Sequence, residues 1–217
     1  MRASMTAFVA VACCAMCRAD FTTIDRIAVV VAGHPIKTSD IDRDIRATEF
    51  INGEPLDLGA EAKKQAAQRL IDQQIIRNEL QVGGYQRPDA SEAASDLDQI
   101  RKERYRGSEA RMHQALARYG LTEDELRARL LWQLTVLKFI DQRFRPGVLV
   151  SDQDIQTYYN QHRAELAKDN GGHTSLEALT PKIREAITAD QINQQFFAWL
   201  DQQRKDVGVT FIPGVLE

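Results

Sequence analysis

Cysteine is nearly absent from the sequence, and its few cysteines lie at one end of the chain. Cys13, Cys14 and Cys17 are the three cysteines among 217 residues. From residue 18 onward, the chain can therefore form no disulfide, no thiol nucleophile and no cysteine-based metal site. The stability of that part has to come from a hydrophobic core.

Proline, glycine and an excess of one charge are also lacking. The chain has 6 Pro and 12 Gly, which excludes a collagen-like or low-complexity protein. Its hydrophobic content of 43% is near the globular average and is sufficient for a core. The formal net charge of −3 gives no electrostatic reason to expect a nucleic-acid partner, and we expect none.

Motifs for catalysis and cofactor binding are missing as well. The sequence contains no P-loop, no GxGxxG after a strand and no GxSxG. The histidines at 34, 113, 162 and 173 follow no metal-ligand pattern such as HExxH. We therefore expect no metal ion, no cofactor and no ATP site.

The N-terminal residues have the layout of a secretory signal peptide. Arg2 supplies a positive charge, residues 5–16 form an apolar run, and Ala19 ends a small-residue cleavage site. The run is too short to span a bilayer comfortably, so we expect no integral membrane span. We predict a signal peptide over 1–19 and a mature domain over 20–217, and hence an exported protein. A cytosolic helix and a lipid-modified Cys13 remain alternatives.

Two strands are predicted, one near each end of the mature chain. The first covers 26–33, with Ile27, Val29 and Val31 on one face and a break at 33–35. The second covers 207–212. Either strand alone would be marginal, whereas pairing them would satisfy their backbone groups. The sequence therefore predicts a domain closed by its own ends.

Helices are predicted over most of the chain between these strands. Apolar residues recur at helical spacing, and Thr122 with Glu125 forms a capping box. The predicted helices begin near residues 38, 60, 88, 108, 122, 151 and 180, the last at Thr180-Pro181. Residues 167–177 are polar and are expected to form a loop. The fold class is therefore mainly α, with a short β pairing.

Several aromatic residues lie next to each other on the last two predicted helices. Tyr158 is followed by Tyr159, and Phe196 by Phe197. Successive helical residues point about 100° apart, so one member of each pair can line a groove while the other enters the core.

Five segments together resemble the family of SurA-type periplasmic chaperones. The strand and turn RIAVVVAGHPIKTSDI is similar to the opening of that family, and RLIDQQIIRNEL to one of its helices. YGLTEDELRARLLWQLTVLKFI and SDQDIQTYYNQH resemble two later helices. Residues 178–212 are similar to the helix and strand that rejoin the N-terminal core. The resemblance covers nearly the whole mature chain.

The chain departs from the family pattern in two places. Ala32 stands where relatives have Asn, and His34-Pro35 is additional. Relatives carry a parvulin-type prolyl isomerase domain of ~90 residues, within the usual range for a domain, where this chain has the eleven residues 167–177. No catalytic residue is therefore carried over from the family.

The resemblance implies an ATP-independent holding chaperone of the periplasm. Its partners would be unfolded or nascent envelope polypeptides, namely outer-membrane or secreted proteins, and no isomerase activity is expected. The candidate peptide-binding residues are Tyr158, Tyr159, Phe197 and Trp199.

Three other functions stay open at this point. The chain could be an unusual peptidyl-prolyl isomerase, or an adaptor that binds one folded partner. It could also be a self-associating bundle whose apolar surface is the interface of a homodimer.

Overall fold

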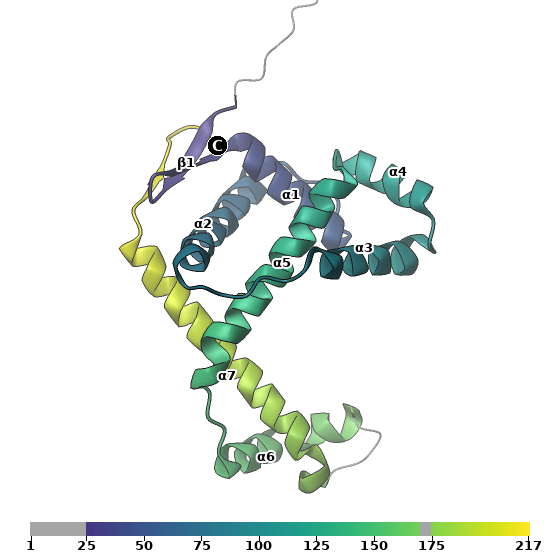
Figure 1. Ribbon diagram of the computed structural model, residues 1–217, viewed down its shortest axis with the longest axis vertical. Coiled ribbons are helices and arrows are strands. Elements are labelled where there is room, and N and C mark those ends of the chain that lie inside the picture. Colours follow the sequence, from purple (N-terminus) through teal and green to yellow (C-terminus); the bar gives the residue numbers. More distant parts are fainter. Residues whose placement is uncertain (1–24, 170–174) are drawn as a thin grey trace, which may run out of the picture.

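The computed structural model of the chain describes residues 25–169 and 175–217 and has a mainly-α fold. In these two ranges the chain forms seven α-helices, one short 3-10 helix and three strands (Figure 1). The predicted fold class is thus confirmed. The expected signal peptide at 1–19 and all three cysteines lie outside the described residues. None of the described helices combines the length and the apolarity that a bilayer crossing requires.

The sheet joins the two ends of the described chain. Its strands are β1 (Ile27–Val31), β2 (His34–Lys37) and β3 (Val209–Phe211), in the antiparallel order β2-β1-β3. Val31 lies opposite Val209, and Val29 lies opposite Phe211. The amide of Ala32 donates to the carbonyl of Gly208 at 2.9 Å, just beyond the paired residues. The predicted pairing of the chain ends is confirmed.

The strand β2 was not predicted from the sequence. His34-Pro35 looked like a break, but both residues belong to β2, and the turn lies one step earlier at Ala32-Gly33. Ala32 and Gly33 have positive φ values of 49° and 81°, as a two-residue hairpin turn with the twist of its strands requires. Proline is accepted because β2 is an edge strand, where no neighbour needs its missing N–H.

The prediction that Ile27 shares a buried face with Val29 and Val31 was wrong. The register of β1 against β2 shifts between Ile27 and Val29, which turns Ala28 inward. Ala28 is fully buried, whereas Ile27 is 43% exposed. Such an extra residue in a strand exchanges the inward-facing and outward-facing side chains on the part of the strand that precedes it.

The first five helices begin and end close to their predicted boundaries. They are α1 (Thr38–Asn52), α2 (Ala60–Val82), α3 (Ala90–Tyr105), α4 (Glu109–Tyr119) and α5 (Glu123–Phe144), followed by the 3-10 helix η1 (Arg145–Gly147). The predicted capping box is present, since the Thr122 amide donates to Glu125 at 2.9 Å and the Glu125 amide to Thr122 Oγ1 at 3.2 Å. The pKa of Glu125 is lowered, mainly because its carboxylate accepts the hydrogen bond from the Thr122 backbone.

The last two helices extend further than the sequence predicted. They are α6 (Asp152–Asp169) and α7 (Leu176–Asp206), so the expected loop over 167–177 is shorter, and its residues 170–174 lie outside the described ranges. Pro181 lies inside α7 and does not start it. The additional turn before Pro181 places Leu179 in the buried cluster that α7 forms with α6, and this burial stabilises it.

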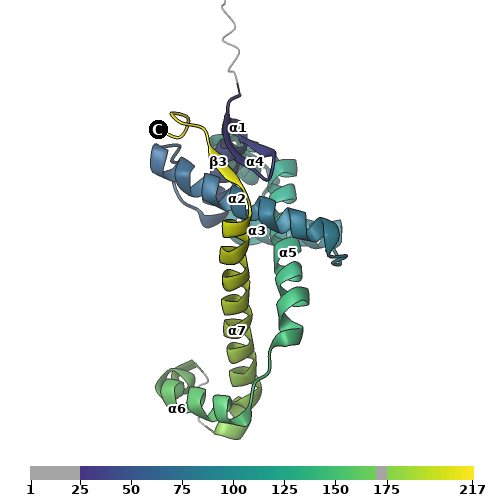
Figure 2. The same ribbon diagram turned by 90° about the vertical axis from the view of Figure 1, so that its left-hand side faces the viewer.

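The long helix α7 connects the two parts of the molecule. It runs from α6 at one end to the sheet at the other (Figures 1 and 2). Its C-terminal half packs into the main core, formed with β1, α1, α2 and α5, and its N-terminal half packs on α6. A separate cluster joins α1 to α3, α4 and α5. The sheet therefore holds α7 against α2, whose Asp72 lies 132 residues before its partner Arg204.

The pairing of β1 with β3 can be tested with an engineered disulfide. Val31 and Val209 directly face each other, so we expect Val31→Cys with Val209→Cys to oxidise in a chain starting at residue 20, which has no other cysteine. Closing so long a loop raises the free energy of unfolding by up to about 5 kcal/mol, and any strain in the bond reduces this gain. Urea unfolding with and without reductant measures the gain.

The control pairs Val30→Cys with Val209→Cys. Val30 is adjacent to Val31, but its side chain points to the other face of the sheet. Equal oxidation of the two pairs, or no oxidation of the first, would contradict the register.

Candidate functional site

An open apolar groove lies between α2, α5 and α7. Its volume is about 600 Å³, and we call it the α5–α7 groove. Its apolar lining consists of Ile76, Trp132, Leu134, Val136, Leu137, Phe196, Phe197 and Leu200. Leu137 is 64% exposed and Phe197 is 57% exposed, although both are large and apolar. Exposed apolar side chains gathered in one groove make it a candidate site for binding another molecule.

The groove exists because α5 and α7 are apolar on more than one side. On α7, Phe196 is buried in the core, and the next residue, Phe197, points about 100° away into the groove. On α5, Phe139 is fully buried, while Leu137 faces the groove. Each helix thus uses one apolar face for packing and leaves part of a second face uncovered.

An ion pair fixes the wall of the groove. Arg204 of α7 donates to both oxygens of Asp72 on α2, at 2.7 and 2.6 Å. Such a bidentate pair defines distance and orientation together. The hydrogen bond to Asp72 is the main reason that the pKa of Arg204 is raised.

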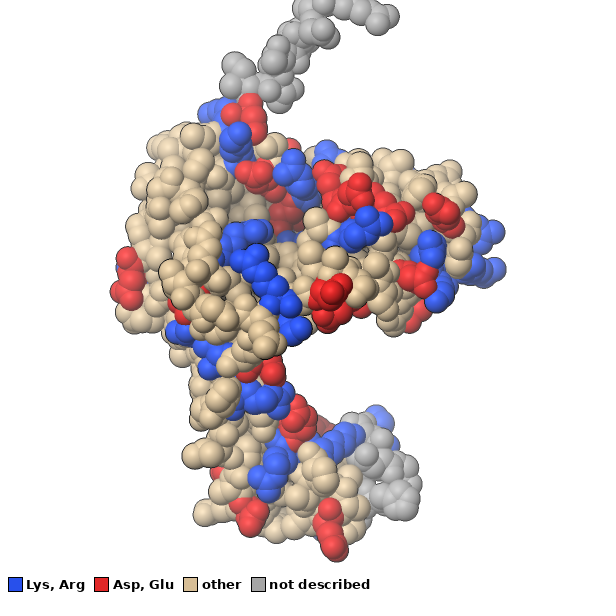
Figure 3. Space-filling model, viewed as in Figure 1, with Lys and Arg blue, Asp and Glu red and all other residues tan. Residues whose placement is uncertain are grey.

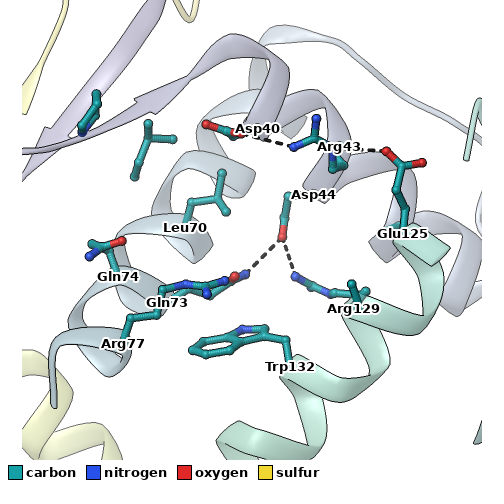
Figure 4. A pocket seen from close by; sticks show the side chains of 14 residues that line it. Asp40, Arg43, Asp44, Leu70, Gln73, Gln74, Arg77, Glu125, Arg129 and Trp132 are labelled. Carbon is teal, nitrogen blue, oxygen red and sulfur yellow. Dashed lines mark hydrogen bonds and ion pairs between the residues drawn. The ribbon is translucent and has the colours of Figure 1, made fainter. Parts of the chain in front are cut away.

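A second hollow, which we call the Trp132 cavity, is lined by charged residues. It has a volume of about 550 Å³ and is bounded by β2, α1, α2 and α5 (Figure 4). The carboxylate of Asp44, whose side chain is only 2% exposed, accepts hydrogen bonds from Arg69 at 2.8 Å, Arg129 at 2.7 Å and Gln73 at 3.2 Å. These contacts link α1, α2 and α5 around one buried negative charge.

The remaining arginines of the cavity differ in their partners. Arg43 lies between Asp40 and Glu125, at 3.3 Å from each. The guanidinium carbon of Arg77 lies 4.0 Å from the centre of the Trp132 ring. Desolvation against that ring, followed by the positive charge of Arg129, lowers the pKa of Arg77.

The two hollows share part of their lining. Gln73, Arg129 and Trp132 belong to both the Trp132 cavity and the α5–α7 groove. An apolar surface and a charged surface are therefore neighbours, with the indole of Trp132 between them.

The structure does not gather the four candidate residues predicted from the sequence into one surface. Phe197 lines the α5–α7 groove. Trp199 is half-buried in the main core, with its ring centre 5.6 Å from that of Phe139 and 6.0 Å from that of Phe144. Of these four aromatic residues, only Phe197 is exposed.

Tyr158 and Tyr159 lie elsewhere, at the α6 end of the molecule. Both are partly buried and pack on the cluster that joins α6 to α7. The ring of Tyr158 stacks on His162 with centres 4.3 Å apart, at the residue where α6 is kinked. Leu137 and Trp132 were not among the candidate residues predicted from the sequence, although the excess of apolar residues on α5 indicated a second apolar face.

One group of side chains has the composition of a metal site. Ligand atoms of Glu109, His113 and Glu123 lie within 4.8 Å of one another. His113 is 3.0 Å from Glu123, which also binds Arg127 at 2.8 Å. The contacts of Glu123 with His113 and Arg127 account for the arrangement, because Arg127 already compensates the negative charge of the carboxylate that a metal would bind.

We expect Asp44→Ala to destabilise the fold strongly. The substitution leaves the charges of Arg69 and Arg129 without their buried partner, and breaking such a pair costs about 3–5 kcal/mol. Urea unfolding of the variant and of the unchanged chain measures the loss. Asp124→Ala is the control, since Asp124 is 89% exposed and its pair with Arg127 is screened by water. Equal losses from both substitutions would contradict a structural role for Asp44.

Comparison with known proteins gives one distant relative. No protein-family model matches the chain. The chain is 27% identical over 180 residues to Chaperone SurA of Chromobacterium violaceum. The match covers 79% of this chain but only 40% of the relative. This similarity supports a SurA-like relationship, and the chain spans less than half the length of the curated relative that it matches.

Proposed function

We propose that this protein is an ATP-independent holding chaperone of the periplasm, which binds unfolded outer-membrane or secreted polypeptides in the α5–α7 groove. The observation that carries the proposal is the uncovered apolar lining of the groove, where Leu137 and Phe197 are more than half exposed. The distant similarity to a protein named as a chaperone supports it. The expected signal peptide at 1–19 supports export.

A holding function requires weak and reversible binding. Micromolar affinity corresponds to about −8 kcal/mol. Burial of roughly 300–400 Å² of apolar surface supplies that amount at ~25 cal/mol/Å², before the cost of ordering the bound segment is subtracted. Affinity in this range lets a client leave by diffusion, so the mechanism needs no energy source.

The surface charges favour many clients over a single acidic or basic one. Lys and Arg alternate with Asp and Glu on the face that Figure 3 shows. At the groove itself, Arg69, Arg129 and Arg204 are accompanied by Asp72 and Asp96. Such a mixed rim attracts no single sign of charge, so apolar contacts decide what binds.

We propose that the protein has no prolyl isomerase activity. The segment between α6 and α7 is too short to build a pocket around a twisted imide, whose rotation has a barrier of ~18–20 kcal/mol. In a refolding assay limited by proline isomerisation, acceleration above background at stoichiometric amounts would instead favour the enzyme.

Substitutions in the groove test the holding function. We expect Leu137→Gln with Phe197→Gln to weaken binding of a fluorescent, permanently unfolded polypeptide by about tenfold, because apolar area is lost from the contact. Suppression of client aggregation should fall in parallel. Since both side chains are largely exposed, the free energy of unfolding should change little.

The matched control is Leu149→Gln, which removes a leucine that is 87% exposed and lies outside the groove. It should leave client binding unchanged. Equal client binding by the unchanged chain, the groove variant and the control variant would contradict the proposal. Light scattering should find the unchanged chain monomeric; a dimer that the groove substitutions dissociate would favour self-association instead.

A further inference from the structure

Arg77 is a cation without an anionic partner. Within residues 25–169 and 175–217, no carboxylate lies within ion-pair distance of Arg77. Its guanidinium stacks instead on the ring of Trp132. Figure 4 shows its guanidinium lying along the indole. A guanidinium stacked on a ring keeps its in-plane N–H groups available for a further acceptor.

The other charges of the Trp132 cavity are balanced when Arg69, which pairs with Asp44 from outside the lining, is counted with them. Arg43 binds Asp40 and Glu125, while Arg129 binds Asp44 together with Arg69. The lowered pKa of Arg77 reflects the cost of its desolvation and of the nearby Arg129 charge. The cavity thus holds a partly desolvated positive charge that a bound anion would compensate.

A second donor in the cavity also lacks a partner. The Nε of Arg129 is buried and has no hydrogen-bond acceptor among the described residues, although both terminal nitrogens of its guanidinium are bonded. Buried donors without acceptors are rare in folded proteins because they forfeit a bond to water. An anion bound beside Arg77 would lie in the same cavity as this unpaired N–H group of Arg129.

We infer that the Trp132 cavity binds a carboxylate attached to an apolar residue, with Arg77 as its ion-pair partner and the α5–α7 groove as the place for the apolar part. The inference rests on the proposed function, because it names the chemistry of the segment that the groove holds. Trp132 lines both hollows, so the carboxylate and the apolar part of such a ligand would lie on either side of its indole.

A carboxylate fits the cavity better than a phosphate does. One guanidinium matches the single charge and the two oxygens of a carboxylate in a planar, bidentate pair. The second charge of a phosphate would face the carboxylates of Asp40, Asp44 and Glu125, which line the same cavity. Repulsion from these groups therefore selects a ligand with one negative charge.

The indole N–H signals of Trp132 and Trp199 give a direct reading of binding by NMR, since the chain has two tryptophans. We expect N-acetyl-phenylalanine to shift the Trp132 signal and to bind at least about tenfold more tightly than N-acetyl-phenylalanine amide, which lacks the charge. Trp199→Phe assigns the two signals. Equal binding of acid and amide would overturn the inference.

A third probe separates the two sources of a carboxylate. N-acetyl-glutamyl-phenylalanine amide carries its charge on a side chain, whereas N-acetyl-phenylalanine carries it at the chain end. Where the acid binds more tightly than the uncharged amide, the order of the two charged probes identifies the source. An absence of shift with both would overturn the inference.

Variants of Arg77 link the effect to this residue. Arg77→Gln should abolish the preference for the acid, and Arg77→Lys should retain part of it, because lysine keeps the charge but not the planar pair. Arg87→Gln makes the same charge change outside the cavity and should behave like the unchanged chain. An Arg77→Gln variant that keeps the full preference would contradict the assignment.

The two proposals fail in different ways. If the unchanged chain suppresses aggregation but shows no preference for the acid, the carboxylate site is wrong and the holding function stands. If it binds the acid selectively but does not suppress aggregation, the site stands and the holding function is wrong.

Discussion

The pairing of β1 with β3 is the constraint on which the rest of this structure depends. It joins Val31 to Val209 across most of the chain and thereby returns the end of α7 to the helices that follow β1. The pair between Arg204 and Asp72 then fixes α7 beside α2. Without this return, α5 would have no neighbour across the α5–α7 groove, and Phe197 would not face Leu137 in one hollow. The site is therefore a product of the closure of the fold and not of any local motif.

The charged network around Asp44 has a complementary role beneath that site. A buried carboxylate that binds three donors gives little net stability, because its desolvation offsets most of the attraction. What it does provide is position: α1, α2 and α5 can meet in only one arrangement that satisfies Asp44, Arg69 and Arg129 together. Because Arg69 and Arg129 also line the groove, the same contacts fix α2 and α5 where they form its walls. Rigid walls with an adaptable apolar lining suit a protein that binds many unfolded chains reversibly.

The sequence predicted those parts of the fold that follow from local chemistry. The capping residues at Thr122 and the apolar periodicity of α2 and α5 act within a few residues, so their boundaries could be read directly. The start of α7 before Pro181 could not be predicted in this way, because it depends on the burial of Leu179 in the cluster with α6. The same applies to the site: Phe197 was a candidate because adjacent helical residues diverge, but its partners Leu137 and Trp132 come from α5, and only the packing of α5 on α7 brings them together.

Whether unfolded chains bind at the α5–α7 groove can be tested by site-specific photo-crosslinking. Benzoyl-phenylalanine can be placed at position 137 or 197 in the groove, or at two exposed apolar positions elsewhere, Val82 and Leu149. We expect an unfolded client to be captured from positions 137 and 197 and not from 82 or 149. Equal capture from all four positions, or capture only outside the groove, would contradict it.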